Sequence, residues 1–116
     1  IIATSRSESS YEDYFKCDLS NNSCLKEVII STNPRLIYHL AASFTNDYEI
    51  DYKINTMVAY QILEILRTEN IKARLILIGS AAEYGRIKSE DNPIPETHPL
   101  CPISIYGLTK AFQTQY

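Results

Sequence analysis

The fold of this chain is decided by the stretch Pro102-Ile103-Ser104-Ile105-Tyr106-Gly107-Leu108-Thr109-Lys110. If a helix begins near Ser104, Tyr106 and Lys110 lie one turn apart on the same helical face. An isolated phenol has a pKa of about 10 and carries protons poorly at neutral pH, but a neighbouring ammonium group favours its ionised form. The pair therefore predicts general acid/base chemistry. The same spacing also arises where a half-exposed aromatic ring lies beside a solvated lysine. The rest of the chain therefore has to distinguish a catalytic pair from an ordinary surface pair.

The composition restricts the classes of protein that fit. A chain of 116 residues forms at most one modest domain, and its 45% hydrophobic content is ordinary for a globular protein. The 11 basic and 14 acidic residues give a net charge of -3. This balance does not favour nucleic acid or an anionic membrane as a partner. We interpret Asp47, Glu49 and Asp51 as a solvated loop or the start of a helix.

Cysteine and histidine usage bears on compartment and metal binding. The three cysteines, Cys17, Cys24 and Cys101, are odd in number and none lies in a C-x-x-C pair. That pattern disfavours a disulfide framework and a structural zinc site, and it favours a reducing compartment, the cytoplasm. With only His39 and His98 available, we expect no metal site. No apolar run is long enough to cross a bilayer.

Strand and helix patterns alternate along the chain. We expect strands at 1–4, 14–19, 36–42 and 75–78, and helices at about 20–33, 51–68 and from 104 onward. The continuous apolar run 36–42 is typical of a parallel strand buried on both faces. The alternation predicts an α/β fold, with a parallel sheet between two layers of helices and ligands at the carboxyl ends of the strands. Residues 81–104 hold four of the five prolines and form a long loop of a kind that is often functional.

Four segments, in order, give the chain a family resemblance. They are His39-Leu40-Ala41-Ala42 after a strand, Asn55 in the long helix, Gly79-Ser80-Ala81-Ala82-Glu83-Tyr84-Gly85 after another strand, and the stretch from Pro102 to Lys110. The chain thereby resembles the extended short-chain dehydrogenase/reductase family of nucleotide-sugar epimerases, dehydratases and keto-sugar reductases. The resemblance implies a Rossmann-like doubly wound parallel sheet, with 1–116 forming part of one NAD(P)-binding domain. A start at Ile1 and an end at Tyr116, inside an expected helix, lead us to expect an internal piece of a longer protein.

The resemblance implies three catalytic residues. Tyr106 would exchange a proton with the sugar hydroxyl or keto oxygen while hydride moves to or from nicotinamide. Lys110 would favour the ionised phenol and bind the nicotinamide ribose. Ser80 would hydrogen-bond the same substrate oxygen, where a preplaced donor stabilises developing charge. Without Tyr106, Ser80 would be interpreted as a cap at a strand end.

The resemblance also implies cofactor contacts. Besides Tyr106 and Lys110, these are Arg6, Asp18, Leu19, Leu40, Ala41 and Ala42. Ala41 and Ala42 would let the cofactor approach the strand end, although two alanines can also simply pack under a helix. His39 is interpreted as a satisfied core histidine rather than as a catalyst.

Arg6 bears on the choice of cofactor. Family members that use NAD commonly have an acidic residue after the second strand, but here Thr4-Ser5-Arg6-Ser7 occupies that place. A guanidinium group beside small hydroxyl residues suits a ribose phosphate, so the sequence favours NADP over NAD. The alternative is a surface arginine in a turn.

Two departures from the family pattern matter. The G-x-x-G-x-x-G phosphate loop is absent from the chain and is expected before Ile1, just as the substrate domain is expected after Tyr116. The dehydratases carry acidic residues where this chain has Ala81 and Ala82, which disfavours water elimination. With Ser80 and Glu83, these residues are the expected substrate contacts, and the pattern is closest to reductases of keto-deoxy nucleotide sugars.

Other functions remain open at this point. An epimerase needs only the tyrosine, serine and lysine and a keto intermediate that rotates. A dehydratase, a non-catalytic dinucleotide-binding relative, or an enzyme for a steroid or flavonoid alcohol would also retain the fold. We expect a homodimer formed by the two long helices, partly represented by 55–66 and 104 onward.

Overall fold

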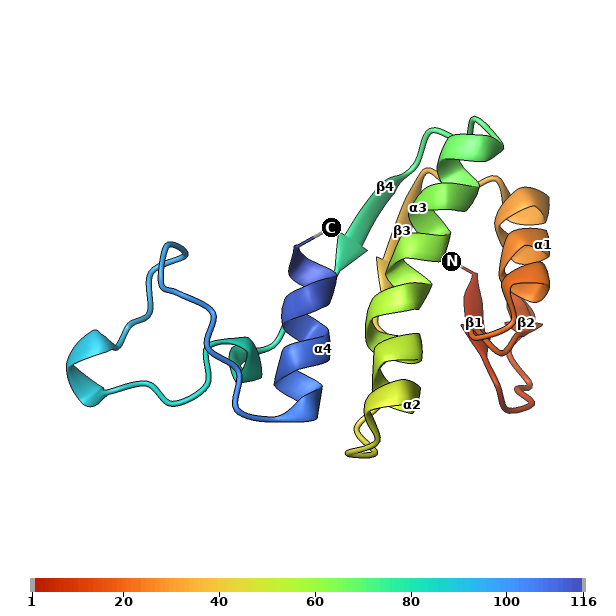
Figure 1. The fold of residues 1–116 in the computed structure, drawn as a ribbon. Helices are drawn as coiled ribbons and strands as arrows, with labels where there is room; N and C mark the ends of the chain where they lie inside the picture. Colours follow the sequence, from red (N-terminus) through yellow and green to blue (C-terminus); the bar gives the residue numbers. More distant parts are fainter. Residues whose placement is uncertain (1, 116) are drawn as a thin grey trace.

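The computed structural model describes residues 2–115, in which short parallel strands alternate with helices as predicted (Figure 1). The strands are β1 (Ala3–Ser5), β2 (Tyr14–Lys16), β3 (Leu36–His39) and β4 (Arg74–Leu77). The helices are α1 (Asn22–Thr32), α2 (Tyr48–Tyr52), the π-helical η1 (Lys53–Met57), α3 (Val58–Thr68), the 3-10 turns η2 (Ala81–Glu83) and η3 (Ser89–Asp91), and α4 (Ile105–Thr114). Ile1 and Tyr116, the ends of the expected first strand and last helix, lie outside the described residues.

The strands form two parallel pairs. β1 pairs with β2, from Ala3 opposite Tyr14 to Ser5 opposite Lys16. β3 pairs with β4 in register from Leu36 opposite Arg74 to His39 opposite Leu77. Within residues 2–115 these pairs are separate two-stranded sheets, so the parallel direction is confirmed while a single continuous sheet is not formed by the described strands.

The hydrophobic core lies where α1 packs against α3. Its buried side chains are Leu25 and Ile29 from α1 and Val58, Ile62, Ile65 and Leu66 from α3. Ile37 of β3 and Leu75 of β4 pack against this cluster, so the two helices cover one face of the β3–β4 pair. Full burial of each such side chain contributes about 1.5–3 kcal/mol.

The prediction that residues 36–42 are buried on both faces is wrong. The strand ends at His39, and its residues alternate in burial: Ile37 and His39 are covered, whereas Leu36 is 42% and Tyr38 is 59% exposed. Successive side chains of a strand point to opposite faces. The described residues therefore leave the face of β3 that carries Leu36 and Tyr38 largely uncovered.

The helix starts follow from capping side chains. The Asn21 side chain accepts hydrogen bonds from the backbone of the first turn of α1, and Asn33 ends that helix in the left-handed conformation. The Asp47 carboxylate accepts from Glu49 N at 3.0 Å and Ile50 N at 3.2 Å, so α2 begins at Tyr48, earlier than predicted. From there α2, η1 and α3 run on without a break, and none of the helices in the described range combines the length and apolarity needed to cross a bilayer.

Candidate active site

Ser80 lies just beyond β4 and opens the η2 turn. Its hydroxyl accepts a hydrogen bond from Ala82 N at 3.2 Å, and its own backbone N–H donates to Glu83 Oε1 at 2.6 Å. This reciprocal capping box closes the turn and fixes the backbone at Ser80. The hydroxyl is half-buried at the carboxyl end of the strand, where ligands of parallel sheets bind.

Tyr106 lies in the first turn of α4. The helix begins next to Ser104, as predicted, and the Ser104 hydroxyl caps it by accepting from Gly107 N at 3.0 Å. Tyr106 is half-buried, and its backbone carbonyl accepts a hydrogen bond from the hydroxyl of Thr109 at 3.0 Å. The capped first turn therefore presents the phenol from a rigid backbone.

Lys110 directs its amine toward the end of β4. Its side chain is almost completely buried, and Nζ donates to the carbonyl of Ile78 and to Gln113 Oε1. Burial lowers the pKa of the Lys110 amine, and the charge of Glu83 opposes this effect. The amine thus ties α4 to the strand end that leads into Ser80.

Two further contacts hold α4 against η2. A side chain at Gly107 would collide with the backbone carbonyl of Ala82, so the absence of one lets the helix and the turn touch. At the last residue of α4, the Thr114 hydroxyl donates to Glu83 Oε2 at 2.8 Å. The structure therefore brings the segments that carry Ser80 and Tyr106 together, as the arrangement predicted from the sequence requires.

Glu83 has partners that the sequence did not reveal. Its carboxylate is buried, with one oxygen bonded to Ser80 N and the other to Thr114. Through these contacts Glu83 positions the η2 turn. That Glu83 also contacts the substrate stays a prediction. Of the other two expected substrate contacts, Ala81 is exposed and Ala82 is half-buried beneath α4.

A buried amide, which the sequence singled out only as a family marker, joins three segments. Asn55 in η1 accepts from Ser43 N at 2.7 Å and donates to Ser43 O at 2.9 Å. It also donates to the Thr109 hydroxyl at 2.9 Å, while Thr56 donates to the Thr109 carbonyl at 2.8 Å. The wider π-helical turn places both side chains toward these partners, and such turns are frequent at functional sites. Asn55 therefore fixes the loop after β3 against α4.

The acidic run begins helix α2, one of the two interpretations made from the sequence, but Asp51 within it is buried and not solvated. Its carboxylate is completely buried and accepts from Thr45 N at 3.0 Å, from Thr45 Oγ1 at 2.8 Å and from Asn46 N at 3.2 Å. Burial alone would raise the pKa of Asp51, but the hydrogen bonds from Thr45, Ser43 and Asn46 outweigh it and lower the pKa. Asp51 thereby shapes the turn that carries Phe44, whose ring meets the Tyr106 ring edge to face at 5.2 Å.

The segment after β3 carries the predicted cofactor residues. Leu40 and Ala42 are exposed and Ala41 is half-buried, so the strand end offers small or apolar side chains to a ligand. His39 is buried as predicted, but its Nε2 atom has no hydrogen-bond partner within the described residues. Burial, with a smaller contribution from the charge of Lys110, lowers the pKa of His39 to about 4. The ring is therefore neutral at physiological pH.

Arg6, Asp18 and Leu19 lie at the end of the other strand pair. Arg6 and Asp18 are exposed and Leu19 is half-buried. Hydrogen bonds from Ser20 lower the pKa of Asp18, and the positive charge of Arg6 contributes to the same effect. The structure thus brings Arg6 near Asp18, and the Tyr14 hydroxyl fixes the Arg6 turn by donating to the carbonyl of Ser5 at 3.0 Å.

The two parallel strand pairs and the helices packed on them form a partial Rossmann-like α/β fold of the short-chain dehydrogenase/reductase class. The chain belongs to the family described as GDP-mannose 4,6 dehydratase, which matches residues 3–116.

Two curated relatives agree with this assignment. A putative UDP-glucose 4-epimerase of Methanocaldococcus jannaschii is 32% identical over 99 residues, which cover 79% of this chain and 31% of the relative. The GDP-mannose 4,6-dehydratase sdnI of Sordaria araneosa is 27% identical over 104 residues, covering 83% of this chain and 19% of the relative. The chain spans less than a third of the length of either relative.

Solved structures share the fold. The UDP-Glc/GlcNAc 4-epimerase of Campylobacter jejuni matches with a TM-score of 0.77 and 26% identity, covering 89% of this chain and 32% of that one. The Bordetella bronchiseptica enzyme WbmG, in complex with NAD and UDP, matches with a TM-score of 0.79 and 22% identity, covering 91% and 34%. RMD from Pseudomonas aeruginosa, complexed with NADPH, matches with a TM-score of 0.77 and 21% identity, covering 87% and 35%.

Proposed function

We propose that the whole protein is an NAD(P)-dependent oxidoreductase for a nucleotide-linked sugar, most like a keto-deoxy-sugar reductase. Residues 1–116 would form part of its dinucleotide-binding domain. The observation that carries this proposal is the attachment of α4 to the β4–η2 segment, by Lys110 on Ile78 and by Gly107 on Ala82. That attachment puts the Ser80 and Tyr106 segments at one strand end.

The chemistry proposed for this site divides among three side chains. Tyr106 passes its phenolic proton to the substrate oxygen, or takes one from it, and Ser80 donates a hydrogen bond to the same oxygen. The buried Lys110 amine orients the bound ribose. A nicotinamide cofactor supplies or accepts the hydride when bound.

The residues at this edge fit a dinucleotide. The side chains of Ala41 and Ala42 are small, and the neighbouring strand β4 is followed by Ile78, whose carbonyl binds the Lys110 amine. At the other strand pair, Arg6 is exposed in a turn fixed by Tyr14, and its guanidinium suits a ribose phosphate. We therefore propose NADP rather than NAD. Titration of the whole protein with NADPH and NADH, in the wild type and in Arg6→Ala, tests this preference.

Reduction and epimerisation are both compatible with these residues, whereas dehydration is less so. Ala81 and Ala82 supply no acid or base at the places where the sequence pattern of dehydratases has them. An epimerase is the second candidate, because the relative from Methanocaldococcus jannaschii carries that name and 32% identity. Product analysis with a keto sugar and with an unoxidised nucleotide hexose separates the two.

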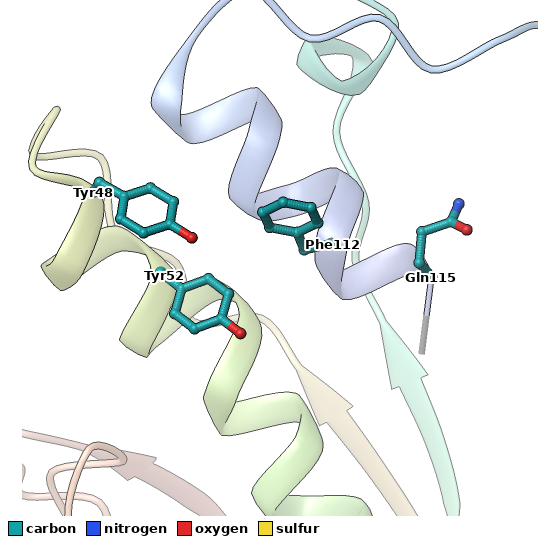
Figure 2. A pocket seen from close by; sticks show the side chains of 4 residues that line it. All are labelled: Tyr48, Tyr52, Phe112 and Gln115. Atoms are coloured by element: carbon teal, nitrogen blue, oxygen red, sulfur yellow. The ribbon is translucent and has the colours of Figure 1, made fainter.

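A homodimer formed through α2, α3 and α4 completes the proposal. Between α2 and α4 lies a shallow hollow of about 300 Å³, where the rings of Tyr48 and Tyr52 face Phe112 across the gap (Figure 2). Tyr48 and Phe112 are each 39% exposed, so part of this aromatic surface is available to a second copy. The mass of the whole protein in solution tests this, with Phe112→Glu as the disrupting variant.

The deciding experiment for the activity is the variant Tyr106→Phe in the whole protein. We expect turnover of a nucleotide-linked keto sugar to fall by about 100-fold or more, because proton transfer by a positioned side chain contributes that much. The dissociation constant for NADPH should change little, since only a hydroxyl is lost. Unchanged turnover would reject the proposed mechanism.

A further inference from the structure

An exposed aromatic ring lies directly against Tyr106. The Phe44 side chain is 77% exposed, yet its ring meets the Tyr106 ring with 5.2 Å between the centroids and 80° between the planes. A phenol that exchanges a proton has to reach the reacting oxygen, so whatever reacts at Tyr106 also lies within reach of Phe44. An apolar surface beside a reacting group is typical of the wall of a binding site.

The turn that carries Phe44 is held in place from below. Asn55 binds both backbone groups of Ser43, and the buried carboxylate of Asp51 binds the backbone N–H groups of the two residues that follow Phe44. Asp51 also accepts from the hydroxyl of the first of these two residues. Because these polar groups are already paired, what the turn presents toward Tyr106 is the phenyl ring.

A phenyl wall distinguishes a carbon that carries a hydroxyl from one that does not. Burying a hydroxyl against it without a hydrogen bond is unfavourable, whereas burying a methyl group is favourable. We take carbon 4 as the reacting position, because the Methanocaldococcus jannaschii relative is named a 4-epimerase. Carbon 6 is attached to the ring carbon next to it and lies near the oxygen on carbon 4. The methyl group of a 6-deoxy sugar is therefore a suitable neighbour for Phe44.

Building on the proposed function, we infer that Phe44 determines substrate specificity: its ring packs against the deoxygenated carbon of the sugar and selects nucleotide-linked deoxy sugars over their hydroxylated counterparts. Phe44 takes no part in proton transfer. It acts through the shape and apolarity of the wall beside Tyr106, and Asp51 and Asn55 hold that wall in position.

The test compares two substrates that differ by one hydroxyl. The whole protein is offered a nucleotide-linked 6-deoxyhexose and the corresponding nucleotide-linked hexose, both in the direction of oxidation with NADP⁺. We expect wild type to favour the deoxy sugar in kcat/KM by about 10- to 100-fold, the range that an apolar pocket achieves against an added hydroxyl. Phe44→Thr should bring the ratio close to 1, mainly through a higher KM for the deoxy sugar, while Phe44→Leu should retain the preference.

The outcomes separate this inference from the proposed function. Turnover of both sugars without a preference in wild type, or an equal preference in wild type and Phe44→Thr, would overturn the role of Phe44 and leave the activity intact. If the protein oxidises neither sugar and also fails to reduce the keto sugar, the proposed function is overturned, and this inference with it. Since Phe44 is exposed, both variants should fold, and matching thermal unfolding curves verify this.

Discussion

Thr109, which lies between Tyr106 and Lys110 on α4, accepts a hydrogen bond from the buried amide of Asn55 at 2.9 Å. The same hydroxyl donates to the carbonyl of Tyr106 at 3.0 Å. The buried Thr109 side chain thus connects the π-helical turn of η1 to the first turn of α4. The position of the Tyr106 side chain therefore depends on the hydrogen bonds of Thr109 as well as on the Ser104 cap of α4.

The hydrogen bond between Asn55 and Thr109 can be removed with little change in side-chain shape. Thr109→Val keeps the volume but removes the hydroxyl, leaving the Asn55 amide without this acceptor. We expect the free energy of unfolding to fall by about 1–3 kcal/mol, the usual cost of an unpaired buried polar group. Thr109→Ser retains the hydroxyl and serves as the control in denaturant unfolding. Equal stability of Thr109→Val and wild type would show that the bond contributes nothing.

For Gly107→Ala we expect the change in stability to be opposite in sign to the usual effect of replacing a helical glycine. An alanine in place of glycine in a helix usually stabilises by roughly 0.5–1 kcal/mol. Here the added Cβ would collide with the Ala82 carbonyl, a backbone atom that cannot move aside alone. Gly107→Ala should therefore destabilise, by about 1–3 kcal/mol as for other overpacked sites, and turnover should fall as α4 and η2 separate.

The control for that variant is Gly79→Ala. Its Cβ would meet only a side-chain atom, Glu83 Oε1, at 3.0 Å. Because a side chain adjusts more readily than backbone, the loss of stability measured by thermal unfolding should be smaller than for Gly107→Ala. A stabilising effect of Gly107→Ala would mean that the helix and the turn are not in contact.

His39 should make stability depend on pH. Its folded-state pKa of about 4 lies below the ordinary value of 6.5, so between these two values the unfolded chain binds a proton that the folded chain does not. Stability contributed by the neutral ring is therefore complete above pH 6.5 and is lost as the pH falls toward 4, with a total of roughly 3 kcal/mol.

The measurement is urea unfolding of wild type, His39→Leu and His98→Gln at several pH values within that window. His39→Leu should flatten the profile. His98, whose Nδ1 atom lies 3.0 Å from the carbonyl of the neighbouring Pro99, is the control: His98→Gln removes the other histidine and should leave the contribution of His39 in place. A wild-type slope in His39→Leu would show that another group carries the pH dependence.

Asp51 should matter more than its acidic neighbours. Asp51→Asn removes an acceptor oxygen from a buried carboxylate that binds Thr45 and Asn46, so we expect a loss of about 1–3 kcal/mol in the free energy of unfolding. Glu49→Gln changes an exposed side chain and should stay within about 0.5 kcal/mol of wild type. Similar losses in the two variants would contradict the role given to Asp51.

The parts of the fold that the sequence predicts best are those set by local chemistry. The predicted limits of the helix at 20–33 and the predicted start of the helix at 104 lie within two residues of the observed ones, because Asn21, Asn33 and Ser104 cap these helix ends. The strand predicted at 75–78 is found with a shift of one residue. The family was identified correctly from short motifs, because the order of Ser80, Tyr106 and Lys110 along the chain is itself informative.

What the sequence could not reveal depends on contacts between distant residues. An apolar run of strand length does not show whether a helix will cover both faces, and so Tyr38 was wrongly expected to be buried. An aspartate in an acidic run looks solvated until the turn that folds over it is known, as with Asp51. The contact between Phe44 and Tyr106 joins a loop to a helix far along the chain, and no local pattern encodes it.

We propose that Ser80 and Tyr106 act on one oxygen beside the nicotinamide. A crystal structure of the whole protein with oxidised cofactor and an unreactive nucleotide sugar tests this arrangement. We expect Ser80 Oγ and Tyr106 Oη both to lie about 3 Å from the same sugar oxygen, with the Lys110 amine at the ribose. A complex in which the two hydroxyls face different clefts, or in which the sugar oxygen binds neither, would contradict it.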